Sequence, residues 1–308
     1  MLASVLVPLD GSEMGEWSLP LASKVARSTG ARLHLAHVHV PYEPEQLLSN
    51  SSFQWEGVDL HDYDIRHVAR EEEYLTRWEN RLESQGAAVD ATVLNGTPIA
   101  DELVQYAKDV GADLIVMTSH GRSGVRRAFW GSVADEMIRK TALPVLVIHP
   151  DHREVAYQTP RTIDHVLVPL DGSTLAEAVL APAADLAKAT GARMTLTHVV
   201  ADPAYLGPRV LGFRPDRLEP ELDGAMAYLE PIAEGLRQDG LDVRVHVVRG
   251  AMPARTITEI ADELKVDLVA LATHGFGGVK RAMFGSVADQ VMRRTELPLL
   301  VVRPPEAN

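Results

Sequence analysis

The chain is organised around Ser119-His120-Gly121-Arg122-Ser123-Gly124-Val125-Arg126-Arg127-Ala128-Phe129-Trp130-Gly131-Ser132, a glycine-containing segment with a near-copy at residues 273–286. A short apolar run precedes each copy, and Gly-Ser-Val-Ala-Asp with helical spacing ends it. A strand that leads through glycines into the first turn of a helix presents backbone N–H groups to an anion. The segment therefore predicts a phosphate-binding loop in each half of the chain.

The same residues also fit a purely structural interpretation. Ser132 and Ser286 stand three residues before Asp135 and Asp289, a spacing like that of a capping box with Asp in place of Glu or Gln. Both interpretations are open at this stage, although the presence of two copies in the same context favours phosphate binding.

Composition narrows the function classes. A chain of 308 residues has room for two domains, and its formal charge of −13 argues against a protein that wraps nucleic acid. The absence of cysteine excludes disulfides, thiol catalysis and cysteine-bound metal. The apolar run at residues 2–9 is short and has no basic leader, so we expect a cytoplasmic protein without a signal peptide or membrane span.

The chain is an internal duplication. Residues 5–12 and 166–173 are identical, and Gly131 and Gly285 of the two glycine segments lie 154 positions apart. The duplication predicts a first domain at 1–150, a charged and proline-containing linker at 151–162, and a second domain at 163–308.

Each half alternates apolar strands with helices, which predicts an α/β fold with a parallel sheet covered by helices on both faces. The expected strands are 4–9, 31–40, 87–94, 112–117 and 143–148 in the first half, and 166–170, 193–200, 242–248, 267–271 and 297–302 in the second. Between the first-half strands we expect helices from Ser12 to about Ser28, and at 62–84, 97–110 and 132–141. Such sheets bind ligands at the carboxyl ends of their strands, where the strand order reverses.

These residues resemble the universal stress protein family in its tandem two-domain form, and the resemblance covers nearly all of the chain. ATP-binding members carry Gly, two residues, Gly, nine residues, Gly and then Ser or Thr. The second glycine, the gap and the final pair are present from Gly121 and from Gly275, whereas Thr118 and Ala272 replace the first glycine. The resemblance implies two Rossmann-like domains of the adenine nucleotide alpha hydrolase type, each with a five-stranded parallel sheet.

The resemblance also implies an adenine nucleotide site in each half, for ATP, ADP or AMP with Mg²⁺. Asp10 and Asp171 would hold the ribose or adenine. The other residues implied as nucleotide-binding are Pro8, Val38, Thr118, Gly121, Arg122, Ser123, Gly124, Gly131, Ser132 and Val133 in the first half, and Pro169, Val199, Ala272, Gly275, Phe276, Gly277, Gly278, Gly285, Ser286 and Val287 in the second.

The two sites are expected to differ in affinity. Thr118 brings a branched side chain to the position of the missing glycine, Ala272 brings one methyl group, and the second loop contains more glycine. We therefore expect tighter nucleotide binding in the second half.

The function that this resemblance implies is that of a cytoplasmic stress-response regulatory protein that binds ATP and forms a homodimer, without nucleic acid or membrane as a partner. Two alternatives are open: a slow ATPase or adenylyl-transferring enzyme that uses His120 or His274, and a scaffold that has lost its nucleotide. No catalytic residues are expected, because neither loop has a Walker lysine or a carboxylate that orients water.

Three other features have simple interpretations. His37 and His39 share a strand face but have no third ligand at a suitable spacing, so no metal site is expected. The run Glu71-Glu72-Glu73 is interpreted as a solvated helix face. The apolar runs 145–148 and 299–302 are equivalent edge strands, and we expect them to cover each other.

Overall fold

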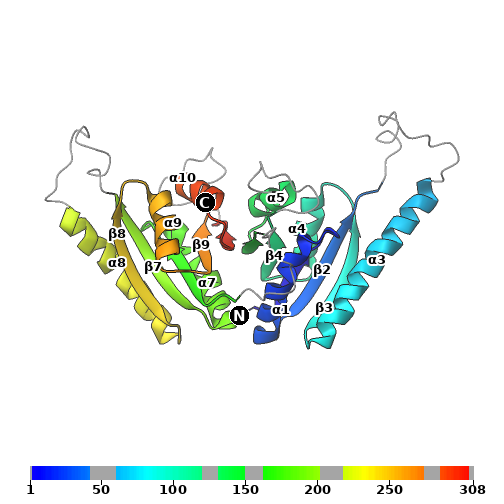
Figure 1. Ribbon diagram of the computed structural model, residues 1–308, viewed down its shortest axis with the longest axis horizontal. Helices are drawn as coiled ribbons and strands as arrows, with labels where there is room; N and C mark the ends of the chain where they lie inside the picture. Colours follow the sequence, from blue (N-terminus) through cyan, green and yellow to red (C-terminus); the bar gives the residue numbers. More distant parts are fainter. Residues whose placement is uncertain are drawn as a thin grey trace. The chain divides into compact units, whose positions relative to one another are not determined.

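The structure is a computed structural model that describes residues 2–41, 60–119, 131–149, 162–201, 218–273 and 285–304. Its described residues form two compact units, one from residues 2–140 and one from residues 141–149 and 162–304. We call them the first and the second unit, and Figure 1 draws their elements. The interior of both glycine loops and most of the predicted linker lie outside the described residues.

The first unit contains a sheet of parallel strands in the order β3-β2-β1-β4. The strands are β1 (Ser4–Pro8), β2 (Arg32–His39), β3 (Ala88–Asn95) and β4 (Leu114–Thr118). The helices are η1 (Gly15–Ser18), α1 (Leu19–Thr29), α3 (Leu60–Ser84), α4 (Ile99–Asp109) and α5 (Ser132–Lys140). The chain builds outward from β1 to β3 and then returns past β1 to β4, so the strand order reverses at β1.

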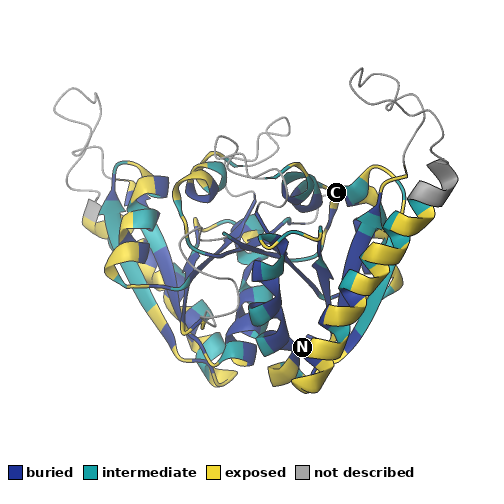
Figure 2. Cartoon of the chain, turned by 45° about the vertical axis from the view of Figure 1, so that its right-hand side comes forward, coloured by how far each residue is buried: buried dark blue, intermediate teal, exposed yellow. Residues whose placement is uncertain are grey.

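Helix α3 covers β2 and β3 with one apolar face. Leu75, Trp78 and Leu82 are buried at spacings of three and four residues, as expected of an amphipathic helix. The opposite face carries exposed residues, which Figure 2 shows along the outer side of this helix. Burial of this stripe fixes which α3 side chains face the carboxyl end of β2.

The start of α1 differs from the prediction. The expected helix from Ser12 is instead a turn, followed by η1 and then by α1 from Leu19. The reason is Pro20, which has no N–H and is tolerated only in the first turn of a helix. The predicted stop at Gly30 is confirmed, because this residue has a φ of 75° in the left-handed region.

The second unit contains six strands in the order β5-β10-β9-β6-β7-β8. The strands are β5 (Val145–Ile148), β6 (His165–Pro169), β7 (Arg193–Ala201), β8 (Val243–Gly250), β9 (Leu268–Ala272) and β10 (Leu299–Val302). The helices are α6 (Thr174–Glu177), α7 (Leu180–Thr190), α8 (Leu218–Gln238), α9 (Pro253–Glu263) and α10 (Ser286–Arg294). Strands β6 to β10 are mutually parallel and repeat the plan of the first unit, with the reversal at β6.

Strands β5 and β10 pair antiparallel, with Leu146 opposite Leu300. Both strands are buried throughout, and these are the two apolar strands that the sequence predicted to cover each other. Strand β5, which the sequence assigned to the first domain, is part of the second unit.

The predicted α/β class and parallel strands are confirmed. All ten predicted strands are present, with ends that differ from the prediction by at most two residues. The central strands β1, β4, β6 and β9 are almost entirely apolar, because strands covered by helices on both faces have no polar side. Strands β3 and β8 contain polar residues and are half-buried along most of their length.

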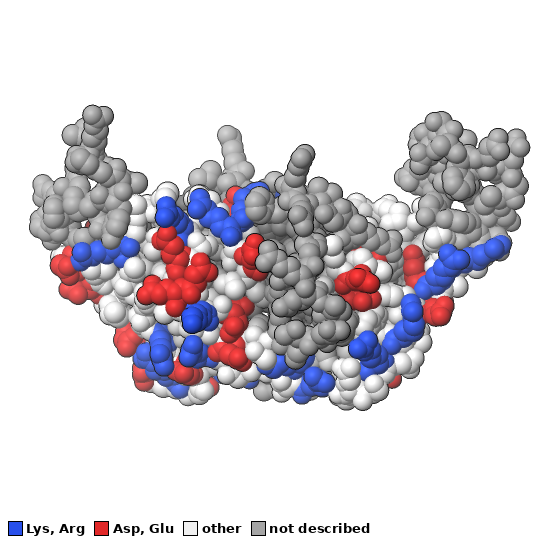
Figure 3. All heavy atoms as spheres, viewed as in Figure 1, with Lys and Arg blue, Asp and Glu red and all other residues white. Residues whose placement is uncertain are grey.

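Charge is mixed on the surface. On the face drawn in Figure 3, acidic and basic side chains of the described residues are interspersed. Within the described ranges, no helix has the length and apolar character needed to cross a membrane.

We predict that Leu146 and Leu300 stabilise the protein jointly. Each Leu→Ala change should lower the free energy of unfolding by about 2 to 4 kcal/mol, because both side chains are fully buried. The double variant should fall short of the sum by about 0.5 kcal/mol or more, since the residues are paired. Urea denaturation measures all three values. Leu35→Ala combined with Leu300→Ala is the control and should be additive; an additive Leu146/Leu300 pair would contradict the pairing.

Candidate functional site

The first unit has a cleft of about 760 Å³ at the carboxyl ends of β1, β2 and β4. It lies where the strand order reverses, as expected for an open parallel sheet. All the described first-half residues that the sequence assigned to a nucleotide line it, namely Pro8, Asp10, Val38, Thr118, Gly131, Ser132 and Val133. Gly121, Arg122, Ser123 and Gly124 lie outside the described residues.

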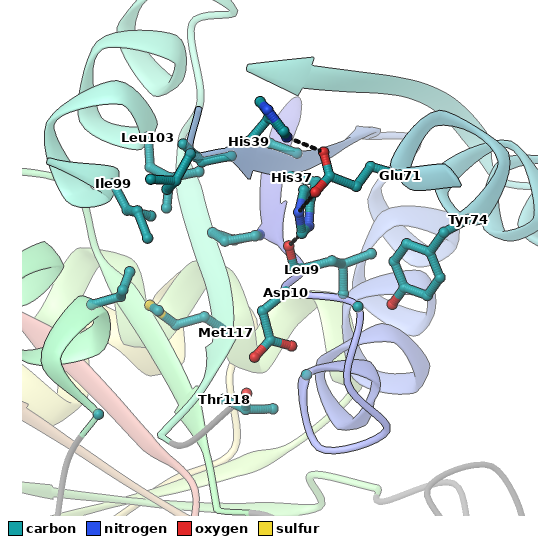
Figure 4. Close-up of a pocket in the computed structure, with 18 of the residues that line it drawn as sticks. Leu9, Asp10, His37, His39, Glu71, Tyr74, Ile99, Leu103, Met117 and Thr118 are labelled. Carbon is teal, nitrogen blue, oxygen red and sulfur yellow. Dashed lines mark hydrogen bonds and ion pairs between the residues drawn. The ribbon is translucent and has the colours of Figure 1, made fainter. Parts of the chain in front are cut away.

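Asp10 is held by the turn that follows β1. Its Oδ1 atom accepts hydrogen bonds from Ser12 N at 3.0 Å and from Ser12 Oγ at 2.6 Å. Ser12 Oγ accepts in turn from Gly15 N at 3.1 Å. A Cβ at residue 15 would lie 2.6 Å from Asp10 Oδ1, so this position requires glycine. The turn fixes the Asp10 carboxyl group beside Thr118, where it points into the cleft (Figure 4).

The two sides of the cleft differ in polarity. Figure 4 shows Ile99, Leu103 and Met117 on one side, with His37 and Tyr74 on the other. An apolar wall suits the face of a planar ring, and polar groups opposite it fix the orientation of a ligand. Burial, followed in importance by the nearby Glu16 carboxylate, raises the pKa of Tyr74, so its hydroxyl keeps its proton.

Helix α5 begins at the edge of this cleft, directly after the glycine loop. The loop ends are joined by a backbone hydrogen bond from Gly131 N to Ser119 O at 2.5 Å. The second unit has the equivalent bond from Gly285 N to Thr273 O at 2.6 Å. Each unit thus places the first turn of a helix next to the end of a central strand, and such a turn favours anions.

The capping-box interpretation is wrong for Ser286. The N-cap of α10 is Gly285, which makes no side-chain cap hydrogen bond, and Ser286 is already the first helical residue. Asp289 binds Arg293 at 2.9 Å rather than reaching back to the helix start. Asp135 of α5 likewise binds Arg139. The carboxylates prefer the arginine one turn later, which leaves the N-terminal turn to other anions.

Thr118 and Ala272 end β4 and β9 and are both buried. Among the described residues, the non-glycine residue with positive φ is Lys265, so neither Thr118 nor Ala272 is strained. Side-chain size is therefore the difference that remains between the two positions.

A histidine–carboxylate cluster lies in the wall of the first cleft. His37 Nδ1 is 2.8 Å from Leu9 O, and His37 Nε2 is 3.3 Å from Glu71 Oε1. His39 Nδ1 is 2.8 Å from Glu71 Oε2, and His39 Nε2 is 3.0 Å from Asp64 Oδ1. Figure 4 shows Glu71 between the two rings.

Sequence reasoning missed this cluster. Glu72 and Glu73 are exposed as predicted, but the Glu71 side chain is only 17% exposed. The spacing of Asp64 and Glu71, seven residues or two helical turns, places them on one face of α3 and was the signal available. No group of three or more potential ligands in the described ranges could hold a metal ion.

The second unit places its predicted residues at the same topological positions. Pro169 ends β6, Asp171 follows it, Val199 lies in β7, and the segment Gly285–Val287 opens α10. Asp171 Oδ1 accepts from Ser173 N and Ser173 Oγ at 3.0 and 2.6 Å, as in the first unit. Gly275, Phe276, Gly277, Gly278 and both loop histidines, His120 and His274, lie outside the described residues.

Comparison with known proteins agrees with this geometry. The model of the Universal stress protein family matches residues 1–149 and 162–303. The chain belongs to the universal stress protein family.

Relatives of this universal stress protein match it over most of its length. A universal stress protein of Mycobacterium tuberculosis is 30% identical over 217 residues, which cover 70% of this chain and 69% of the relative. One from Mycolicibacterium smegmatis is 26% identical over 97% of both chains. The crystal structure of a universal stress protein from Archaeoglobus fulgidus has the same fold, with a TM-score of 0.70 and 21% identity over 97% of this chain and 98% of that one.

We predict that His198, which follows Thr197 in β7, reduces stability in acid. Burial lowers its pKa, an effect partly offset by the Leu170 carbonyl and Asp171. The folded state then binds fewer protons than the unfolded chain below about pH 6.5, so stability falls as pH decreases through that value. His198→Asn should remove part of the loss between pH 7.5 and 5.5 in urea denaturation. His246→Asn, on the neighbouring strand β8, is the control, and an unchanged pH profile in His198→Asn would contradict the prediction.

Proposed function

We propose that this universal stress protein binds an adenine nucleotide, ATP, ADP or AMP with Mg²⁺, at the carboxyl ends of its sheets and acts as a cytoplasmic regulatory protein in a stress response. Members of the family bind adenine nucleotides. The observation that carries the proposal is the cleft of the first unit, in which Asp10, an apolar wall and the start of α5 surround one space. Its volume of about 760 Å³ lies within the range of small-molecule sites.

Each part of a nucleotide has a suitable neighbour in this cleft. The base fits the apolar side formed by Ile99, Leu103 and Met117. The Asp10 carboxylate accepts hydrogen bonds from ribose hydroxyls or from the adenine amino group. Phosphates fit the first turn of α5 at Ser132 and Val133 and the glycine loop before it. Mg²⁺ would be held by phosphate oxygens and water, since it commonly keeps several waters beside a substrate phosphate.

A regulatory role fits the side chains in this cleft better than rapid catalysis does. Among the described lining residues, the Asp10 carboxyl is committed through Oδ1 to the turn at Ser12, and neither loop sequence contains a Walker lysine. Occupancy by a nucleotide would then act by changing conformation or assembly. We propose a homodimer as the assembly, and the net charge of −13 supports a partner other than nucleic acid.

Calorimetric titration of the full chain with MgATP tests the proposal through one residue in each half. Asp10→Asn keeps an oxygen for the Ser12 turn but removes the charged acceptor, and should weaken the first site by about 10 to 100-fold. Asp171→Asn should do the same to the second site, which we expect to be the tighter one.

The control is Asp262→Asn, which changes an exposed carboxylate on α9 and should leave binding unaltered. No binding of MgATP, ADP or AMP by the unmodified chain would contradict the proposed function. If Asp10→Asn and Asp171→Asn weakened the tighter MgATP binding event equally, the expected difference in affinity between the two sites would be contradicted.

A further inference from the structure

The hydrogen bonds of the histidine–carboxylate cluster in the first unit require more protons than two neutral rings beside ionised carboxylates can supply. The Leu9 carbonyl only accepts hydrogen bonds, so His37 Nδ1 must carry a hydrogen. The other three ring nitrogens of His37 and His39 all face carboxylate oxygens of Glu71 or Asp64. An ionised carboxylate also only accepts, and a neutral imidazole has a single N–H. His37 Nδ1 and both ring nitrogens of His39 are hydrogen-bonded, so beside ionised carboxylates the His39 ring is an imidazolium ion. His37 Nε2 lies 3.3 Å from Glu71 Oε1 and forms an ion pair with it when the His37 ring is also protonated.

The net charge of the cluster depends on how many protons its two histidine rings carry. With both rings protonated, two imidazolium ions balance the carboxylates of Glu71 and Asp64, and the cluster is neutral. With both rings singly protonated, one hydrogen bond of His39 and the ion pair of His37 with Glu71 are lost, and the cluster carries two negative charges. The uncompensated charge then lies on Glu71 and Asp64, whose side chains are 17% and 31% exposed, so it is only partly solvated.

Other ionisable groups face the same cleft and add to its field. They are Asp10 after β1 and His67, Arg70, Tyr74 and Arg77 of α3. Among them Arg70 and Arg77 favour ionised carboxylates, whereas Asp10 favours protonated rings. The cluster differs from these groups in being buried and internally hydrogen-bonded.

The second unit has an apolar pair at the equivalent positions. By the repeat, His39 corresponds to Val200, since residues 5–12 and 166–173 are 161 positions apart. Glu71 corresponds to Ala225 and Tyr74 to Tyr228, at the 154-residue offset of the glycine loops. Val200 and Ala225 are buried together with Leu222 and Val247 packed against them. The fold thus accepts an uncharged wall here, which means that the charged one is not needed for folding.

We propose that ligand binding in the first cleft is coupled to proton uptake by His37, Glu71, His39 and Asp64, and that the second site lacks this coupling. For the identity of the ligand this inference rests on the proposed function. A nucleotide is an anion, and it binds better next to a neutral cluster than next to a negative one. Affinity at the first site therefore falls as the pH rises, whereas the second site keeps its affinity.

The variant that tests the coupling gives the first unit the two residues that the second unit has at the equivalent positions. His39→Val combined with Glu71→Ala reproduces the pair Val200 and Ala225, which packs well in its own unit. Both it and the reference protein carry Asp171→Asn, so that the first site dominates binding. MgATP is titrated calorimetrically in buffers of different ionisation enthalpy between pH 6.5 and 8.5, after treatment with a chelator.

The reference protein should take up about half a proton or more per ATP, with affinity falling about threefold or more per pH unit. The double variant should show only the smaller change that comes from the phosphate groups of ATP. Equal proton uptake in both proteins would overturn the coupling while leaving nucleotide binding intact. Absence of binding in both proteins would overturn the proposed function and the coupling with it.

The ligand-free full chain provides a second readout. Ring ¹⁵N NMR at pH 6 should find hydrogens on both ring nitrogens of His39, which both face carboxylates, and Glu71→Gln should remove this state. A singly protonated His39 ring at pH 6, or tight binding of Zn²⁺ by His37 and His39, would overturn the proposal.

Discussion

The reversal of strand order at β1 determines where this protein can bind a ligand. Because β2 and β4 flank β1 in a parallel sheet, the carboxyl ends of all three strands meet at one edge. Asp10, Val38 and Thr118 are far apart in sequence and lie together for this reason alone. The crossover helices leave on opposite sides of the reversal, so the loops cannot fill the space between them, and a cleft remains. Strand β6 has the same place between β7 and β9 in the second unit.

Periodicity and repetition predicted the parts of the fold that depend on local physics. The central strands could be predicted from their apolar runs, and the end of α1 from Gly30. Asp10 was identified through family resemblance, and its turn explains the residues around it, since Ser12 binds its carboxyl group and Gly15 leaves room for it. The pairing of β5 with β10 also followed from their apolar edges.

Two features that could not be predicted from the sequence, the contacts of Glu71 and the N-cap of α10, depend on tertiary structure. From the sequence, Glu71 is expected on a solvent-exposed helix face with Glu72 and Glu73. Its contacts with His37 and His39 depend on the packing of α3 on β2. Ser286 has the spacing of an N-cap, yet the N-cap of α10 is Gly285, Ser286 is the first helical residue, and Asp289 is bound to Arg293. Glu71 could face solvent or the two histidines, and Ser286 could cap the helix or lie within it. In each case the three-dimensional structure selects one of the two arrangements.

The duplicated halves show which features the fold requires and which it allows to vary. The turn at Asp10 and Asp171, the bond that closes each glycine loop, and the strand reversal are the same in both units. The wall beside β2 and β7 is not, because His39 and Glu71 are replaced by Val200 and Ala225. The two candidate sites therefore share one architecture and differ in the charge of this wall.

The central claim is that the cleft at the strand reversal holds an adenine nucleotide in one orientation. A crystal structure of the full chain with MgATP tests it most directly. The account predicts adenine against Ile99, Leu103 and Met117, ribose at Asp10, and phosphates at the first turn of α5. A nucleotide bound with its phosphates at the apolar wall, or bound elsewhere while this cleft stays empty at millimolar ATP, would contradict it.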